Sequence, residues 1–471
     1  MQKAILILLT LFALNASAQD VEKWNLQKCV DYALEHNTSV QQGELQGEIL
    51  SNNLRQAKLG RVPTLNGSGN HNYNIGRTID PFTNTFSTTT IQSNSFSLSS
   101  GVLLYGGSQV NNSIKQSQKA TEANKQSIEV VRNQIALSVA TTYLQIIQSE
   151  ENLSIAESQL EITKNQLDRA LKLVQSGSVN QSTSLNLKAQ LANDRVNVIN
   201  AQNSIQLGYN ALINLMQFPL DQNFEIERNI NTQTPTLPSE SVATLYEMAL
   251  ENLPEIKQAE LQITQSQLGE KVAAGGLQPS LSAYGNINTV YSQSGKEINT
   301  TGQYDLVPIG YTKTSLEPVL QPQPITEIKD KAFGNQISDN LGQQVGISLS
   351  VPVFNGYRNK TAFENAKLNT KIFELALDNT KNQLRNDITT AYTKLKAAKS
   401  RYDASKLSEE AQKLNFEFSQ KRFDAGMMNG VDLLTAKNQW SQSLTQMLNA
   451  KYEYIFRALI IEFYKGNKLS L

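Results

Sequence analysis

The chain contains few of the residues that enzymes use for nucleophilic, metal or nucleotide chemistry. Its 471 residues include one cysteine, Cys29, and two histidines, His36 and His71. We find no glycine-rich loop of the phosphate-binding kind. A single cysteine forms no internal disulfide, so the fold is expected to need none. We therefore expect no catalytic residue, no metal site and no cofactor, and the chain is not expected to be an enzyme.

An excess of charge of one sign is also missing. Lysine and arginine total 42, as do aspartate and glutamate, and the net charge is +0. Nothing in this balance indicates a nucleic acid as partner. Beyond the N-terminus no apolar run reaches the ~20 residues of a transmembrane helix. Membrane strands give a much weaker signal, so the membrane stays open as a location.

The N-terminus carries the features of a signal peptide. Lys3 is followed by the apolar run Ala4–Leu14 and by Ala16-Ser17-Ala18, which is typical of a cleavage site. We predict a signal peptide over residues 1–18 and cleavage before Gln19. No cysteine follows the apolar run closely enough to indicate a lipid anchor. The chain is expected to be exported.

The sequence repeats itself, and long stretches of it lack glycine and proline, as long helices require. The segment Leu26–Glu35 aligns with Val242–Glu251. Further equivalent pairs are Pro63 with Pro279, Gly107 with Gly356, and Gly177 with Gly426. We predict a first repeat over residues 19–218, a linker over 219–238, a second repeat over 239–465 and a tail over 466–471. The second repeat is longer in the loop around Ser294–Asn340.

Each repeat begins with a helical pattern, at about Leu26–Leu59 and Val242–Ala274, and continues with a pair of strands. The strand pairs lie at about 64–105 and 280–354, where apolar residues alternate with asparagine and serine. Segments of about 10 residues with this period are typical of transmembrane β-strands. Two half-buried hairpins of a soluble sheet are the alternative. Polar loops are expected at Gly76–Asn84 and Gln293–Asn340.

A helical hairpin follows each strand pair, at about 108–217 and about 357–465. Apolar residues recur every seven positions in both, as in Val139, Ile146 and Leu153, which predicts coiled-coil packing. Helices of ~67 residues would be roughly 100 Å long. The hairpin tips are expected near Gly177 and Gly426, with Gly426 and Gly430 supplying positive φ. Asp432 falls in the first turn of the returning helix, where the helix dipole favours a carboxylate.

Four strands per chain predict self-association. Four strands do not close a barrel, and open sheet edges are not tolerated in lipid. Three copies would give a β-barrel of twelve strands, an even number within the range of outer-membrane barrels. The same copies would supply twelve helices. We therefore expect a homotrimer that is mainly α with a β-barrel part.

Several motifs resemble those of the TolC-type outer-membrane efflux family. They are Ala33–Asn37, Leu104–Gly107, Arg422–Gly426 and Val431–Lys437. The resemblance implies a trimeric duct in the outer membrane of a Gram-negative bacterium, with a helical tunnel in the periplasm that opens at the hairpin tips. It also implies a periplasmic adaptor and an inner-membrane transporter of the RND, ABC or MFS type as partners.

The resemblance also suggests which residues form a periplasmic gate. Asp432 stands at the first of two acidic positions of the family, and Thr435 replaces the second acid. Phe423 fills an aromatic position without a hydroxyl, and Met428 replaces an arginine. The first tip carries Thr183 where an acid is expected. Packing of Phe423 and Met428 is expected to substitute for a polar latch.

The predicted function is the exit duct of a tripartite efflux or type I secretion system, a passive conduit gated at its helical tips. The alternative is the periplasmic adaptor of such a pump, which has one helical hairpin flanked by small β-domains. A purely structural coiled-coil protein is disfavoured by the strands.

Overall fold

The computed structural model describes residues 23–79, 84–88, 90–219, 224–228 and 235–467. The predicted signal peptide, residues 1–18, and parts of the predicted linker and tail lie outside these residues. The chain divides into two compact units, which are described separately. The first unit runs to Ser51 and continues with Lys119–Thr264 and Lys371–Leu471; the second comprises Asn52–Gln118 and Gln265–Thr370.

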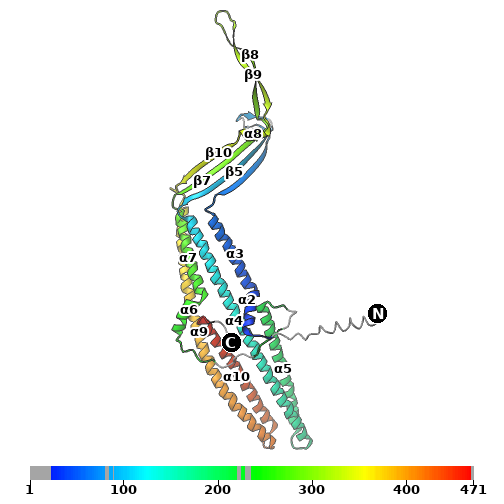
Figure 1. Ribbon diagram of the computed structural model, residues 1–471. Coiled ribbons are helices and arrows are strands. Elements are labelled where there is room, and N and C mark those ends of the chain that lie inside the picture. Colours follow the sequence, from blue (N-terminus) through cyan, green and yellow to red (C-terminus); the bar gives the residue numbers. More distant parts are fainter. Residues whose placement is uncertain (1–22, 80–83, 89, 220–223, 229–234, 468–471) are drawn as a thin grey trace, which may run out of the picture. The chain divides into compact units, whose positions relative to one another are not determined.

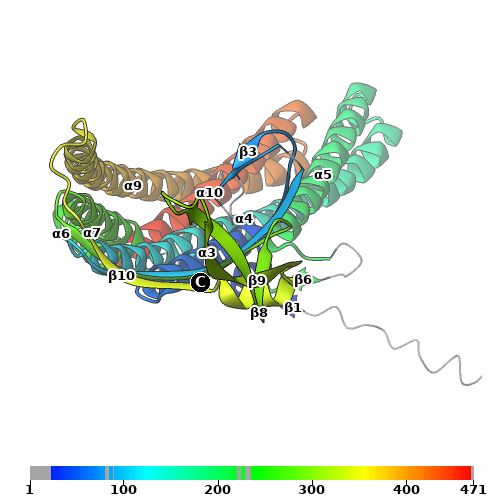
Figure 2. The same ribbon diagram turned by 90° about the horizontal axis from the view of Figure 1, so that it is seen from above.

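Eight helices hold most of the described residues. They are α2 (Leu26–His36), α3 (Thr38–Leu59), α4 (Gln109–Gln175), α5 (Gln181–Met216), α6 (Val242–Asn252), α7 (Pro254–Gly275), α9 (Arg358–Asp424) and α10 (Gly430–Tyr464). Helices α4 and α5 form the first helical hairpin, and α9 and α10 form the second (Figure 1; Figure 2 shows the two pairs from above). Helices α4 and α9 both have 67 residues.

The first helical pattern of each repeat is interrupted, which the sequence reading missed. Between α2 and α3, Asn37 is extended, with ψ of 127°. Its side-chain oxygen accepts the N–H of Ser39 at 2.9 Å, so Asn37 starts α3 as a cap. Between α6 and α7, Leu253 is extended because a residue before proline is disfavoured in the helical region, and Pro254 begins α7.

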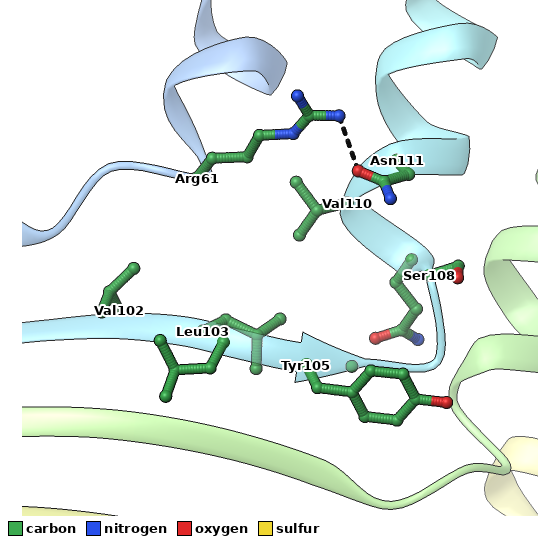
Figure 3. Close-up of a pocket in the computed structure, with 10 residues that line it drawn as sticks. Arg61, Val102, Leu103, Tyr105, Ser108, Val110 and Asn111 are labelled. Carbon is green, nitrogen blue, oxygen red and sulfur yellow. Dashed lines mark hydrogen bonds between the residues drawn. The ribbon is translucent and has the colours of Figure 1, made fainter.

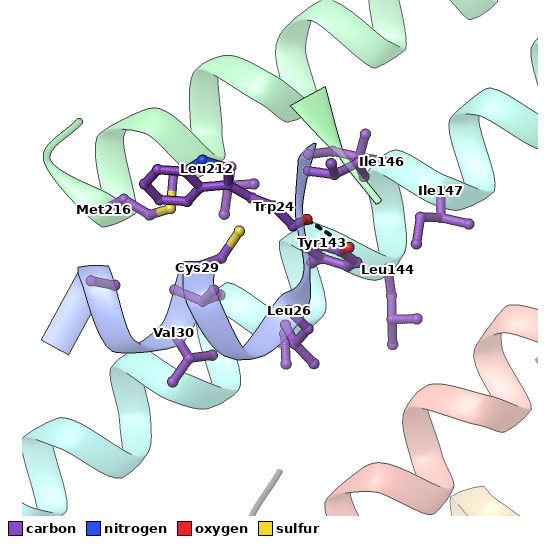
Figure 4. Packing of buried hydrophobic residues seen from close by; sticks show 14 of the residues in the cluster. Trp24, Leu26, Cys29, Val30, Tyr143, Leu144, Ile146, Ile147, Leu212 and Met216 are labelled. Carbon is purple, nitrogen blue, oxygen red and sulfur yellow. Dashed lines mark hydrogen bonds between the residues drawn. The ribbon is translucent and has the colours of Figure 1, made fainter. Parts of the chain in front are cut away.

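A buried cluster near the N-terminus of the first unit is built from several helices (Figure 4). Two short strands, β1 (Lys23–Trp24) and β6 (Glu225–Ile226), pair in parallel there. The buried Tyr143 of α4 donates its hydroxyl proton to the carbonyl of Glu227 at 2.7 Å. Cys29 and Trp24 are buried in the same cluster. The segment before α2 and the segment after α5 are therefore held together against α4.

The second unit contains a four-stranded antiparallel sheet in the order β10–β7–β5–β2. Its strands are β2 (Thr64–Asn74), β5 (Ile91–Gly106), β7 (Ser280–Ser292) and β10 (Gly342–Ser350). The sheet is not closed within the described chain, so β2 and β10 are edge strands. Apolar side chains of the edge strands are strongly exposed: Leu65 is 68% and Val345 88% accessible. Contiguous exposed apolar surface of this kind marks a site of contact with a partner or a membrane.

The segment predicted as the polar loop Gln293–Asn340 is folded, and the prediction was wrong. It contains β8 (Lys296–Tyr311), β9 (Pro318–Asp330) and the short helix α8 (Phe333–Asp339). Among the residues that the structure describes, strands β8 and β9 pair only with each other. Prolines that suggested a loop are tolerated here because each strand of a two-stranded ladder has a free edge. The predicted loop Gly76–Asn84 likewise contributes β3 (Thr78–Ile79), which pairs with β4 (Phe86–Ser87).

One glutamine fixes the base of the β8–β9 hairpin. Gln336 of α8 is 1% exposed. Its side-chain oxygen accepts the N–H of Ser292 at 3.0 Å, and its amide nitrogen donates to the carbonyls of Ser292 and Lys331 at 3.0 and 2.8 Å. The hairpin therefore starts from a rigid attachment at the end of β7.

Over the described part of the chain, no helix is long and apolar enough to span a membrane. Nor does this part contain a group of three or more histidine, cysteine or acidic side chains that could hold a metal ion.

Candidate functional site

The tip of the first helical hairpin is a tight turn around Gly177. This glycine has φ of +73°, in the left-handed region. The N–H groups of Gly177 and Ser178 donate to the carbonyls of Val174 and Leu173 at 3.0 and 2.9 Å. This pair of bonds is the Schellman motif, which satisfies the last carbonyls of a helix. Asn180 then caps α5.

The tip of the second hairpin has the same geometry. Gly426 has φ of +72°. The N–H groups of Gly426 and Met427 donate to the carbonyls of Phe423 and Arg422 at 3.0 and 2.9 Å. Asn429 caps α10, because its side-chain oxygen accepts the N–H groups of the two residues after Gly430. Both chain reversals therefore use one glycine and one asparagine.

Gly430 does not act as the sequence reading predicted. It is absent from the positions with positive φ and is the first residue of α10. Its small size matters for another reason: a Cβ atom at Gly430 would lie 2.5 Å from the Cγ2 atom of Thr183. The start of α10 and the start of α5 are therefore in van der Waals contact, and Gly430 permits this approach.

Asp432 and Thr435, two of the predicted gate residues, lie on the exposed side of α10. The Asp432 carboxylate accepts the side-chain N–H of Asn429 at 2.7 Å. The Thr435 hydroxyl donates to the carbonyl of Val431 at 2.9 Å, within its own helix. Both side chains are exposed in the single chain, so Asp432 presents a carboxylate to whatever faces the tip.

Phe423 and Met428, the other predicted gate residues, belong to an apolar cluster at the tip. Phe423 is buried and packs with the buried Phe416 and Leu433. Half-buried residues pack against this cluster: Ile162 and Leu173 from α4, Met428 from the turn and Trp440 from α10. The cluster therefore joins the second hairpin to the first, and the tips meet through apolar packing.

Polar contacts also run between the two hairpins. Arg169 of α4 pairs with Asp424 at the end of α9, at 2.6 Å. The Gln166 amide nitrogen donates to the side-chain oxygen of Gln420 at 3.1 Å. The Arg169–Asp424 pair is exposed, and pairs of this kind contribute at most about 1 kcal/mol.

A buried ion pair, which the sequence analysis does not predict, joins the two hairpins about two helical turns from the start of α10. Lys437 of α10 approaches Asp194 of α5 with 2.6 Å between Nζ and the carboxylate, and their side chains are 1% and 4% exposed. The signal was available: Lys437 lies four residues after the buried Leu433 and three before Trp440, on the inward face. Burial lowers the pKa of Lys437, and the hydrogen bond that Lys437 donates to the Asp194 carboxylate opposes this shift.

A surface hollow lies in the second unit, where β5 leads into α4 (Figure 3). It measures about 340 Å³ and is lined by β5 residues including Val102 and Tyr105. Arg61 donates to the side-chain oxygen of Asn111 at 2.6 Å at its rim. None of the predicted site residues lies there. The hairpin tips are the stronger candidate, because they collect all the predicted gate residues together with a buried charge.

Two helical hairpins attached to strands with exposed apolar side chains form the architecture of an outer-membrane channel. The chain belongs to the outer membrane efflux protein family, whose model matches residues 29–216 and 245–458. It is therefore an outer-membrane protein of a transport family and not of a family of enzymes. The match is to the outer-membrane component of a pump, not to the adaptor that we considered as an alternative.

Solved structures of several channels share this fold. The channel CusC matches with a TM-score of 0.74 and 15% identity, covering 94% of this chain and 92% of CusC. The outer-membrane channel CmeC of Campylobacter jejuni matches with a TM-score of 0.73 and 19% identity, covering 95% and 87%. The alkaline protease secretion protein AprF of Pseudomonas aeruginosa is 25% identical over 122 residues. That match spans 26% of this chain and 25% of AprF.

Proposed function

We propose that this protein is the outer-membrane exit duct of a tripartite efflux or type I secretion system. One observation carries the proposal: a single chain of the efflux family contains both amphipathic strands and two helical hairpins. Each hairpin has a helix of 67 residues. Helices of this length measure about 100 Å, enough to extend far from a membrane. The helical part would lie in the periplasm and the strands in the membrane.

The duct is proposed to be a homotrimer. The edge strands β2 and β10 carry unpaired backbone groups, which lipid does not satisfy. Pairing β10 of one copy with β2 of the next would close a barrel of twelve strands. The exposed apolar side chains on these strands would then face lipid. The same three copies would contribute α4, α5, α9 and α10 to a tunnel of twelve helices.

The hairpin tips are the proposed gate. Three Asp432 carboxylates, one from each copy, would converge at the narrow end and attract cations. Phe423 and Met428 would hold the closed form through the apolar cluster that joins the two hairpins. Thr435 stands where the family has its second acid, so a single acidic ring is proposed. Opening would be a movement of packed helices, without chemistry.

The proposed partners are a periplasmic adaptor and an inner-membrane transporter of the RND, ABC or MFS type. The partial similarity to a protein named for secretion of alkaline protease supports the type I secretion branch. The full-length similarity to structures named as outer-membrane channels supports a conduit in either branch. No residue of the described tips forms a site specific for one cargo, as is suitable for a passive duct.

The proposal is tested by fractionation and conductance. The full-length protein should separate with the outer membrane, and the purified protein should produce discrete ion-conducting steps in a planar lipid bilayer. A periplasmic adaptor would fractionate differently and would not conduct on its own. Outer-membrane protein that never conducts, in repeated reconstitutions with a known porin as positive control, would contradict the duct.

A further inference from the structure

Three helices of two different hairpins meet at Lys437. Its ammonium group lies 2.6 Å from the Asp194 carboxylate of α5 and donates to the Thr163 hydroxyl of α4 at 2.6 Å. The second carboxylate oxygen of Asp194 accepts the side-chain amide of Gln190 at 2.8 Å. Lys437 itself is on α10. One buried charge of the second hairpin is therefore neutralised entirely by groups of the first.

The other polar contacts between the hairpins are less completely buried: those of Gln166 with Gln420 and of Tyr452 with Glu151 are half-buried. Arg169 and Asp424 are 53% and 33% exposed, and the bonds between Gln148 and Asn449 and between Asn438 and Gln190 are on the surface. Exposed contacts exchange readily with water and contribute little. A buried pair differs because removing one partner leaves an uncompensated charge. The Lys437–Asp194 pair is therefore the contact that discriminates most sharply between joined and separated hairpins.

The surroundings of the pair make partial separation unfavourable. A cavity of about 310 Å³ adjoins Asp194 and is lined mainly by polar side chains, among them Asn197, Ser441 and Thr445. Gln159, also at its wall, is 4% exposed, and neither of its side-chain polar atoms has a hydrogen-bond partner within the described chain. A slightly displaced Lys437 would lose Asp194 before it gained full hydration. Separating Lys437 from Asp194 would leave two buried charges without a charged partner, which costs free energy.

We propose that Lys437 is the positioning residue of the gate: its buried pair with Asp194 and Thr163 holds the start of α10, which carries Asp432, against the first hairpin in the closed state. This rests on the proposed duct function and adds to it the contact that must break on opening. The apolar cluster around Phe423 brings the tips together, and the ion pair selects the one register in which they close.

The first test measures the position of the hairpins without using channel activity. Arg169→Cys and Asp424→Cys are introduced into full-length protein that carries Cys29→Ser, and cross-linking by a short bismaleimide is followed on denaturing gels. Adding Lys437→Met or Asp194→Asn should slow cross-linking at least about fivefold, the size of a modest coupling between sites. Lys437→Arg, which keeps the charge, should cross-link at close to the parental rate.

A compensated variant separates charge from packing. In Lys437→Met with Asp194→Leu no buried charge is left unpaired, and such replacements are often tolerated. Its cross-linking should return to within about twofold of the parental rate. If both single variants cross-link at the parental rate while circular dichroism shows them folded, Lys437 does not position the tips. If the compensated variant is as slow as the single variants, the charge is not the cause, and the proposal also fails.

The second test measures conductance in planar bilayers with variants that lack the added cysteines. Lys437→Met should raise the open probability at least about fivefold over the wild type, while the surface variant Asp403→Asn, whose ion pair with Lys399 lies within α9, should not change it. If Lys437→Met slows cross-linking but neither the wild type nor the variant conducts, the contact is upheld and the duct function is overturned. Conductance in both with no difference between them would overturn the gating role of Lys437.

Discussion

At the scale of single residues, the only cysteine of the chain reports on the core of the first unit. Cys29 is completely buried between α2 and its neighbours (Figure 4). Burial raises the pKa of its thiol to about 12, against a smaller lowering by Lys28. The thiolate is the reactive form of cysteine. Cys29 is therefore expected to be inert in the folded protein at neutral pH.

A thiol reagent tests this expectation directly. Native protein at pH 8 should show almost no labelling by a maleimide, whereas the protein in strong denaturant should show one label per chain.

The raised pKa of Cys29 also carries a stability prediction. The thiol keeps its proton to higher pH in the folded state than in the unfolded state. The contribution of Cys29 to stability is therefore complete below the unfolded thiol pKa and is lost as the pH rises towards about 12. Denaturant titrations above pH 9 should show a steeper decline in wild type than in Cys29→Ser, because buried tyrosines such as Tyr143, whose pKa is also raised by burial, contribute to both proteins. Fast native labelling would contradict the buried core.

Asp432 gives the residue-scale prediction for the gate. Asp432→Asn should lower cation selectivity and weaken block by multivalent cations in single-channel recordings, because the acidic ring would be lost. Asp403→Asn is the matched control, since Asp403 is exposed on α9, well before the tip, and is paired with Lys399. Equal selectivity in wild type and Asp432→Asn would leave Asp432 with only its role beside the Asn429 cap.

What the sequence predicts at this scale depends on whether a residue acts through its own chemistry or through its position. Gly177 and Gly426 can be found because positive φ favours glycine. Gly430 was misassigned, since its role is to admit Thr183, a contact between segments far apart in the chain. Helical spacing places Lys437 on the inward face of α10, but its partners, Asp194 and Thr163, come from other helices, and the local sequence does not identify them.

At the scale of elements, each hairpin reversal depends on an asparagine cap. The Asn429 side-chain oxygen accepts the N–H groups of Val431 and Asp432 at 3.0 and 2.9 Å. Loss of such a cap costs about 1 kcal/mol. Asn429→Ala should therefore increase amide hydrogen exchange at the start of α10 about fivefold. Asn180→Ala should do the same at α5 alone, and uniform protection in both variants would show that the caps are unimportant.

The attachment of the β8–β9 hairpin yields a second element-scale prediction. Gln336→Ala removes three hydrogen bonds, two of them buried and one half-buried, at a cost of about 2 kcal/mol or more. Limited proteolysis should then cut within residues 293–340 much faster than in wild type. Gln343→Ala, on an exposed position of β10, is the control. Unchanged protection would mean that strand pairing alone orders the hairpin.

The elements differ in how readily the sequence reveals them. Alternation of apolar residues with asparagine and serine predicts β2, β5, β7 and β10, because the two faces of each strand differ sharply in polarity. The β8–β9 segment was read as a loop because Pro308, Pro318 and Pro322 usually exclude strands. A hairpin that pairs with nothing else has edges on which proline does no harm, and local sequence does not show that isolation.

At the scale of the whole molecule, the open sheet predicts the oligomeric state. Protein purified in mild detergent should have three times the mass of the chain by light scattering corrected for detergent, because the exposed edges of β2 and β10 require partners. Substituting proline for Ile347 in the edge strand β10 should lower the trimer fraction, since proline removes a backbone donor. A stable monomer that inserts into bilayers would rule out closure by three copies.

The equal length of α4 and α9 constrains how this protein can change over evolutionary time. Both have 67 residues, and the turns that follow them are in contact through Thr183 and Gly430. Seven residues inserted into each of the two helices of one hairpin alone would displace its turn by about 10 Å and break that contact. The two hairpins can therefore lengthen only together. An insertion of whole heptads in one half of the gene requires a matching insertion in the other half.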